Sequence, residues 1–318
     1  MYELFISDDK NLYTPVTTGS VQLDWERQGV PGKLTFSYLA DAGLPVREGS
    51  PVGLKVDGKD VFFGYLFERR HGKDRIVSAT AYDQLRYLKN KDTYEYKNKT
   101  ATEVIQMVAG DFQLKTGELE DTKLKIKERR EPNKTLFDVI INALYITLQK
   151  AGEMYVLYDQ YGFLTLKNIQ NMKLDLLICH RTAEDYDYSV SIDGDTCNQI
   201  KLYQEDKEAG KRRIYLAKDT GNTNQWGVLQ YYEQVEEGEN GQAKADALLA
   251  LYNQKTRKLS VKNALGDIRV RPGCLLPVQL DLGEEQINHY MLIEKASHRF
   301  ENGFHTMDLT LRGGGFLA

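Results

Sequence analysis

Apolar residues recur at alternate positions through much of the first 83 residues. In the run Val61–Phe67, valine and aromatic residues occupy every second position, which is typical of a half-buried β-strand. Asp57-Gly58 separates this run from the apolar run Val52–Val56, and an Asp-Gly pair between two such runs predicts a β-hairpin. A further strand is predicted over Arg75–Tyr82. Short strands joined by turns favour a small barrel or sandwich.

The apolar period changes to that of a helix between residues 84 and 178. Thr100 and Glu103 fit a capping box, in which each side chain binds a free amide of the first helical turn. A second helix is predicted from the apolar stripe over Leu136–Leu148, with Gly152 at the C-terminal cap. The apolar face of the first helix would be formed by Val104, Ile105, Val108, Ala109 and Phe112.

A hairpin is predicted after the second helix. Met154–Tyr158 and Phe163–Lys167 flank the turn Asp159–Gly162, where Gly162 can adopt the left-handed conformation. Two helices and this hairpin would form a compact α+β insert.

From about residue 179 the pattern returns to short strands. One helix is expected near Gln242–Lys255. The last hairpin has Asn302-Gly303 as its turn, between Ser297–Phe300 and the alternating run Met307–Leu311. The other predicted strands are Asn198–Gln204, Arg213–Ala217, Val228–Glu233, Arg257–Lys262, Cys274–Leu280 and Tyr290–Glu294.

Composition places the chain among ordinary globular proteins. Its 318 residues are 41% hydrophobic and 28% charged, which suffices for a sizeable core and for two or three domains. The net charge of −4 argues against a protein that coats nucleic acid. The N-terminus does not resemble a signal peptide, and no apolar run is long enough to span a bilayer. We therefore expect folding in a reducing cytoplasm.

The sequence contains no pattern of reactive residues that predicts catalysis, a metal site or a cofactor. Cys179, Cys197 and Cys274 are widely spaced and match no zinc or disulfide pattern. His298 and His305 flank the last hairpin turn and could face each other, but a metal needs three or four convergent ligands. Gly313-Gly314-Gly315 precedes no helix, and a flexible tail or a link to a partner is the better interpretation.

Charged clusters leave two interpretations open. The acidic runs Glu233–Glu239 and Glu284-Glu285 could supply the paired carboxylates of a glycosidase, although a solvated loop is the simpler interpretation. In the segment Lys123–Arg130, lysines at 123, 125 and 127 alternate and could make one face of a strand basic. Such a face could contact an acidic partner or nucleic acid, or protect a sheet edge from aggregation.

Several segments together resemble the XkdQ/YqbQ-type tail proteins of phages and phage-like particles. More distantly, the chain resembles the baseplate hub proteins of contractile tails and the base of type VI secretion spike proteins. The resemblance covers nearly the whole chain in the right order. It rests on Tyr82–Leu88, Lys99–Ile105, Gln225–Gln230, the turn Gly266–Gly273, His298–Phe300 and Gly303–Leu309.

The resemblance implies a β-rich α+β fold, in which two small β-barrel modules bracket an inserted α+β module. The modules would be residues 1–88, 89–178 and 179–318. The family motif would be structural, with Pro272 and Gly273 making a tight turn. Its residues here are Gly266, Asp267, Arg271, Pro272 and Gly273.

The same resemblance implies a non-enzymatic hub subunit located in the virion or tail-like particle. The hub would be a homotrimer that joins the tail tube, or a tube-initiator protein, to the central spike. Its channel would pass the tape-measure protein, and no membrane is involved. Two alternatives stay open at this stage: a tail-associated peptidoglycan hydrolase, and a carbohydrate-binding module suggested by the 20 tyrosines.

Overall fold

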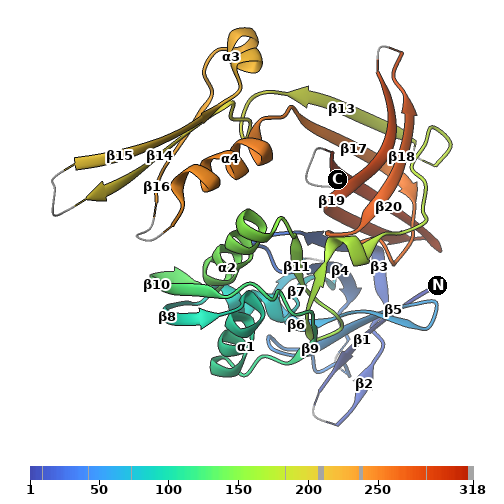
Figure 1. Cartoon of the computed structure of the whole chain (residues 1–318). Coiled ribbons are helices and arrows are strands. Elements are labelled where there is room, and N and C mark those ends of the chain that lie inside the picture. Colours follow the sequence, from blue (N-terminus) through green and yellow to red (C-terminus); the bar gives the residue numbers. More distant parts are fainter. Residues whose placement is uncertain are drawn as a thin grey trace.

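One large antiparallel sheet joins the two ends of the chain (Figure 1). The computed structural model describes residues 1–313 except Asp9, Ala42, Lys73, Ala183, residues 207–210, residues 236–238 and Glu284. Within this part, twelve strands form the sheet in the order β13-β17-β20-β19-β3-β4-β7-β6-β5-β1-β2, and β18 also pairs with β19.

The first region supplies seven of these strands and the third region supplies five. Those of the first region are β1 (Tyr2–Ser7), β2 (Leu12–Tyr13), β3 (Thr17–Glu26), β4 (Lys33–Leu39), β5 (Pro51–Val56), β6 (Lys59–His71) and β7 (Ile76–Tyr82). Those of the third region are β13 (Asp185–Ser191), β17 (Thr256–Leu265), β18 (Leu275–Asp281), β19 (Gln286–Glu301) and β20 (Phe304–Gly313).

The predicted hairpin turns are confirmed. Asp57 and Gly58 have φ of 49° and 73°, and Asn302 and Gly303 have φ of 51° and 81°. Positive φ at both central residues is the signature of the type I′ turn, whose twist matches that of the strands it joins. These turns set β5 against β6 and β19 against β20.

Strand β19 connects the first region to the third. The sequence predicted two separate strands here, Tyr290–Glu294 and Ser297–Phe300, but both lie in one strand of 16 residues. Its first half pairs with β18, and its second half pairs with β3, where Leu23 lies opposite His298. A register shift against β20 between Ile293 and Lys295 marks the change from one half to the other.

The mostly β architecture is as predicted, but the two closed barrels are not confirmed. Closure would need β1 to pair with β3, or β13 with β18, and neither pairing occurs in the described part of the chain. Both edges of β3 are already used by β4 and β19. The outer edge of β18 meets bridges from Lys173 and Ile178 instead. The strands therefore continue as one sheet.

The insert has the predicted helices and hairpin. Its helices are α1 (Ala101–Asp111) and α2 (Leu136–Ala151), preceded by the 3-10 turn η1 (Gln84–Lys89) and followed by η2 (Ile169–Met172). Two small sheets accompany the helices: β8 (Lys91–Lys99) with β10 (Ile126–Thr135), and β9 (Thr116–Leu119) with β12 (Leu164–Asn168) and β11 (Tyr155–Asp159).

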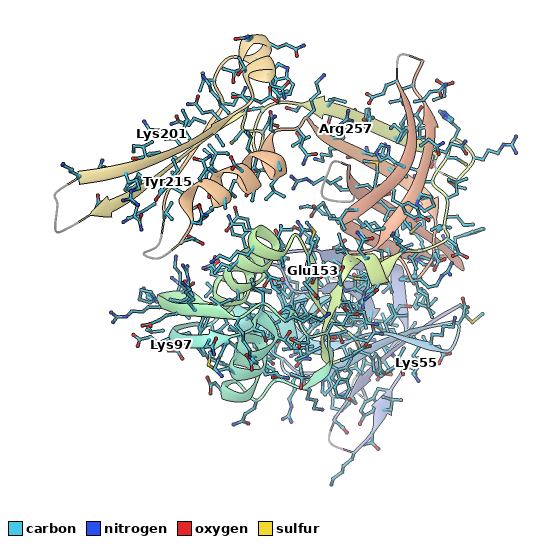
Figure 2. All side chains as sticks on the ribbon, viewed as in Figure 1. Lys55, Lys97, Glu153, Lys201, Tyr215 and Arg257 are labelled. Atoms are coloured by element: carbon cyan, nitrogen blue, oxygen red, sulfur yellow. The ribbon has the colours of Figure 1, made fainter. Side chains whose placement is uncertain are left out.

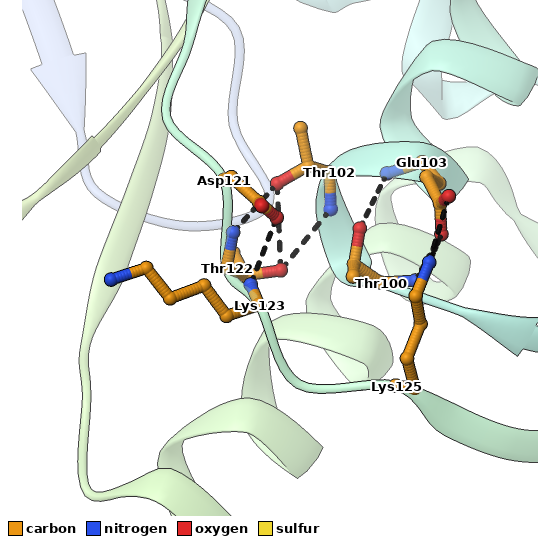
Figure 3. A network of polar contacts seen from close by, with 7 residues as sticks. All are labelled: Thr100, Thr102, Glu103, Asp121, Thr122, Lys123 and Lys125. Carbon is orange, nitrogen blue, oxygen red and sulfur yellow. Dashed lines mark hydrogen bonds and ion pairs between the residues drawn. The ribbon is translucent and has the colours of Figure 1, made fainter.

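Helix α1 begins with the predicted capping box (Figure 3). The Thr100 hydroxyl accepts from the Glu103 amide at 3.2 Å, and the Glu103 carboxylate accepts from the Thr100 amide at 2.6 Å. Gly152 caps α2 with φ of 71°, as predicted. Phe112, predicted on the apolar face of α1, is its C-terminal cap residue and packs against the same core as that face.

The prediction of a basic strand face at Lys123–Arg130 is wrong for its first residues. Lys123 has φ of 58°, a left-handed conformation outside the range of a regular strand, and its amide donates to the Asp121 side chain at 2.9 Å. Lys125 reaches Glu103 at 2.8 Å, so its charge is paired with the helix cap (Figure 3). Strand β10 begins only at Ile126.

Residues 197–254 of the third region form a separate layer, called the arm below (Figure 1). The arm contains β14 (Gln199–Asp206), β15 (Lys211–Lys218), α3 (Thr220–Trp226), β16 (Gln230–Gln234) and α4 (Gly241–Tyr252). Its strands pair in the order β15-β14-β16, and α4 packs against them around Ile200, Leu202 and Leu248. Lys150 of α2 binds Glu239 of the arm at 2.8 Å.

The apolar cores of the regions share residues across the predicted boundaries. Phe300 of β19 packs in the core formed by β1–β7, and Val156 of the insert packs in the core of the third region. No helix in the described residues is long and apolar enough to cross a membrane. The division at residues 88 and 178 stays a prediction.

Candidate functional site

The turn Gly266–Gly273 lies where the first region, the insert and the third region meet. Its last residues form a β-turn, in which the Cys274 amide donates to the Arg271 carbonyl at 3.1 Å. Gly273 has φ of 95°, as the third position of a type II turn requires, and buried Pro272 precedes it. The expected tight turn is therefore present.

Asp267 and Gly266 fix the other end of this turn. The Asp267 carboxylate accepts from the Arg269 amide at 2.9 Å and from its guanidinium at 2.7 Å. The Gly266 amide donates to the His305 carbonyl at 2.9 Å. A Cβ at position 266 would lie 2.2 Å from the His305 ring, so only glycine fits this close approach.

Arg271 extends from this turn to contact the other two regions. Its guanidinium lies 4.1 Å from the ring centre of Tyr158 in the insert and 4.9 Å from that of Trp25 in β3. It donates to the Gln160 side chain at 2.7 Å and to the Asp159 carbonyl at 3.1 Å. One side chain therefore links all three regions through cation–π contacts and hydrogen bonds.

Two buried carboxylates complete the cluster. Asp83 accepts from the Gly32 amide at 2.9 Å and caps η1 through the Leu85 amide at 3.0 Å. Asp159 accepts from the Gly162 amide at 2.7 Å and from the Gln84 side chain at 3.0 Å. We call this cluster the junction. It comprises Trp25, Asp83, Gln84, Tyr158, Asp159 and Arg271.

Burial raises the pKa of both carboxylates. For Asp83 the proximity of Asp159 raises the pKa further, whereas the amides of Gly32 and Leu85 and the charge of Arg271 act in the opposite direction. For Asp159, the Gly162 amide, Gln84 and Arg271 oppose the effect of burial. Backbone amides donate to both carboxylates, so the two side chains hold the junction together.

His298 and His305 face each other, as the sequence suggested. Their nearest ring nitrogens, Nδ1 of His298 and Nε2 of His305, are 2.9 Å apart, and Nε2 of His298 lies 2.9 Å from the Val270 carbonyl. Because a carbonyl can only accept, Nε2 of His298 carries its proton, and His305 donates to Nδ1. Burial lowers the pKa of His298 to about 4, so the ring is neutral near pH 7.

The other candidate residues do not converge on a reactive site. Glu233 and Glu239 both bind Lys244, at 2.9 and 3.3 Å, and Glu285 pairs with Arg257 at 3.4 Å. Glu236, Glu237, Glu284, Gly314 and Gly315 lie outside the described residues. No group of three or more His, Cys, Asp or Glu side chains in the described part could hold a metal ion.

An apolar cavity of about 280 Å³ separates α2 from the arm and from β19. Ile141, Leu144 and Tyr145 line it on the side of α2, and Tyr252 lines it on the side of the arm. Its charged lining groups bind each other in pairs, Arg27 with Glu294 at 2.7 Å and Arg312 with Asp195 at 3.4 Å. The lining therefore offers space for apolar side chains and no set of catalytic groups.

Sequence reasoning found one half of the junction. It selected the turn Gly266–Gly273 and the segment Tyr82–Leu88, which contains Asp83 and Gln84. It did not identify Trp25, and it did not predict that Asp159 is hydrogen-bonded to Gln84 and Arg271. Asp159 opens a predicted hairpin turn, which explained the residue locally and gave no signal of its long-range contacts.

Comparison with known proteins confirms the family resemblance that the sequence motifs indicated. A family model described as YQBQ-like matches residues 21–312. The phage-like element PBSX protein XkdQ of Bacillus subtilis is 31% identical over 319 residues, which cover 97% of this chain and 96% of XkdQ.

Solved structures share the fold over almost the whole chain. The 43 kDa tail protein of prophage MuSo2 from Shewanella oneidensis aligns with a TM-score of 0.71 and 12% identity, covering 97% of this chain and 98% of that protein. The E. coli c3393 protein, a component of the type VI secretion system, aligns with a TM-score of 0.58 and 12% identity, covering 98% and 76%. At these identities, the likeness describes the fold alone.

Proposed function

The chain belongs to the YQBQ-like family, and from this premise we propose that it is a structural hub subunit of a phage tail or a phage-tail-like particle. In this role three copies form a ring that joins the tail tube, or a tube-initiator protein, to the central spike. The ring surrounds the path of the tape-measure protein. The protein then resides in the virion or particle after assembly in the cytoplasm.

One observation carries this proposal: a single sheet runs through the first and third regions, and the junction fixes the insert against it. A sheet of twelve strands is a rigid plate. Two curved halves of such a plate can serve as the two ring-forming modules of each subunit, although they are not closed barrels. Three subunits then supply six modules, which suits the docking of a six-fold tube on a three-fold spike.

The motif Gly266, Asp267, Arg271, Pro272 and Gly273 has a structural role in this proposal. Its support is geometric, because Arg271 touches both other regions and Gly266 packs directly against His305. We propose that the motif keeps the modules at the fixed angle that a closed ring needs.

Co-purification with the tube and spike proteins of the same particle tests the hub role. The purified chain is expected to bind both proteins together in one complex. A folded chain that binds neither protein contradicts the role.

Zymography on cell walls tests the alternative of a peptidoglycan hydrolase. We expect no clearing by the chain, because the buried carboxylates Asp83 and Asp159 are bound to backbone amides and Glu233 is bound to Lys244. Clearing that is lost on substitution of a glutamate would favour the hydrolase instead.

A further inference from the structure

Among the strands that end a sheet, β13 and β15 have open edges of opposite charge. Within the described residues, β13 ends the large sheet and pairs only with β17, and β15 ends the sheet of the arm and pairs only with β14. An open edge presents free amides and carbonyls that another strand can bind. Figure 1 shows β13 at one end of the large sheet, next to β17, and β15 along the arm that extends away from the sheet.

The β13 edge is acidic. Asp185 and Asp187 are exposed on one face of the strand. Glu184 precedes the strand, and Asp193 and Asp195 follow it. Within the described part of the chain, Asp187 forms no ion pair, so its charge is available to a partner.

The β15 edge is basic and partly apolar. Lys211, Arg212, Arg213 and Lys218 are exposed along it, and only Arg212 is paired with a described acid, Glu205, at 3.1 Å. Ile214 and Leu216 are each 47% exposed on the face of the sheet that α4 does not cover. Lys201, labelled in Figure 2, lies on the neighbouring strand β14 and on the same face. Its ammonium group is 6.0 Å from the ring centre of Tyr232.

We propose that β15 of one copy pairs with β13 of a second copy, so that the large sheet of one subunit continues into the arm of the next. This inference rests on the proposed assembly of the chain into a ring, and it identifies the contact that builds the ring. The contact is head-to-tail, which is the interface type that closes into a ring.

Charge favours the pairing of β13 with β15 over the pairing of either edge with the same edge of another copy. Two β13 edges would bring aspartates together, and two β15 edges would bring lysines and arginines together, so both self-pairings are repulsive. Pairing β13 with β15 joins opposite charges and is attractive. The same charged residues therefore disfavour β13–β13 and β15–β15 pairing between copies.

A parallel register fits both the charges and the apolar side chains. It places Asp185 opposite Lys211 and Asp187 opposite Arg213 on one face. On the other face it places Tyr188 opposite Ile214 and Val190 opposite Leu216. Val190 is 41% exposed in the single chain, and such cross-strand apolar pairs stabilise a sheet. An antiparallel register that sets both aspartates opposite cations would overlap over only three residues.

Charge reversal in the full-length chain tests the pairing. One variant carries D185K/D187R, so that both edges are basic, and a second carries K211D/R213D, so that both are acidic. Self-association, followed by sedimentation over a concentration series, is expected to weaken by roughly tenfold or more in each. Combining all four substitutions restores opposite charges and should recover the wild-type association.

Controls separate this effect from charge change and misfolding. K123E/K134E changes the net charge as much as K211D/R213D does but at two exposed lysines of the insert, and it should associate like the wild type. The single reversals D187R and R213D give milder variants if a double variant does not fold. Association should weaken between about 0.05 M and about 0.5 M salt because the charges are exposed.

Three results would overturn the pairing: folded reversal variants that associate like the wild type, a combined variant that does not recover, or a wild-type chain that stays monomeric throughout. None of these results decides the hub role, because binding to the tube and spike proteins is measured separately. If the chain associates through β13 and β15 but does not bind the tube and spike proteins, the hub role is contradicted and the strand pairing is not.

Discussion

At the scale of single residues, His298 is held neutral by the groups around it. It is 1% exposed, its Nε2 donates to the Val270 carbonyl, and its ring contacts Trp25 edge-on at 5.4 Å. Protonating the ring would place a charge in this apolar space and remove its acceptor for His305. The charged form is therefore disfavoured in the folded protein and not in the unfolded chain.

The lowered pKa of His298 should be measurable in the pH dependence of the unfolding free energy. Its folded pKa is about 4, below the unfolded value of about 6.5. The unfolded chain therefore binds more protons between these values, so His298 contributes its full stability above pH 6.5 and loses it as the pH falls towards 4. Relative to H298Q, the wild type should lose about 3 kcal/mol of unfolding free energy over this range.

Urea unfolding of both proteins at a series of pH values measures this difference. Asp83 and Asp159 have raised pKa values and act in the opposite direction, but they are present in both proteins and cancel. An equal pH dependence in H298Q and the wild type would contradict a neutral, buried His298.

Substitution by alanine should lower the stability of the protein at one glycine and leave it unchanged or raise it at another. A Cβ at Gly266 would collide with the His305 ring, whereas a Cβ at Gly110 in α1 meets nothing within 4 Å. G266A should therefore destabilise the protein by about 1–3 kcal/mol through overpacking. G110A should be neutral or stabilising by up to about 1 kcal/mol, because alanine favours a helix more than glycine does. Urea unfolding checks both, and a G266A variant as stable as the wild type would show that the contact is loose.

At the scale of elements, local sequence signals specified the turns and helix starts. The capping box at Thr100 and the Asp57-Gly58 and Asn302-Gly303 turns depend on residues within four positions of each other, so they could be predicted from the sequence. The expected basic strand face does not form at Lys123 and Lys125, because alternation of charge does not reveal a positive φ. Asp121 and Glu103 bind these two residues in the loop before β10.

Long-range pairing could not be predicted in the same way. Strand β3 pairs with β19 across more than 250 residues, with Trp25 opposite Ala296. Neither strand contains a sequence signal that indicates which distant strand it pairs with. This pairing produces one continuous sheet, whereas two closed barrels were expected. The bulge between Ile293 and Lys295 likewise gave no sequence signal.

Arg271 should be the most sensitive link between the elements. R271M removes the hydrogen bonds to Gln160 and Asp159 and the charge near two buried carboxylates, so it should cost about 2–4 kcal/mol of unfolding free energy. R269M is a matched control two residues away, because Arg269 is exposed and its ion pairs with Asp267 and Asp175 are solvated. It should cost less than about 1 kcal/mol. Chemical denaturation compares the two, and equal costs would contradict a special role for Arg271.

At the scale of the whole molecule, the three regions are joined by a shared sheet and by shared apolar cores. The large sheet contains both ends of the described chain, the junction fixes the insert, and Lys150 and Glu239 tie the arm to α2. In the proposed hub, a subunit joined in this way would pass load from the tube to the spike. In the proposed ring, the open edges, acidic on β13 and basic on β15, would determine how copies meet.

Electron cryomicroscopy of assembled particles that contain this chain tests the central claim most directly. The account predicts three copies in a closed ring at the boundary between tail tube and spike, with continuous density from β13 of one copy to β15 of the next. A different number of copies, or a position away from that boundary, would contradict the account.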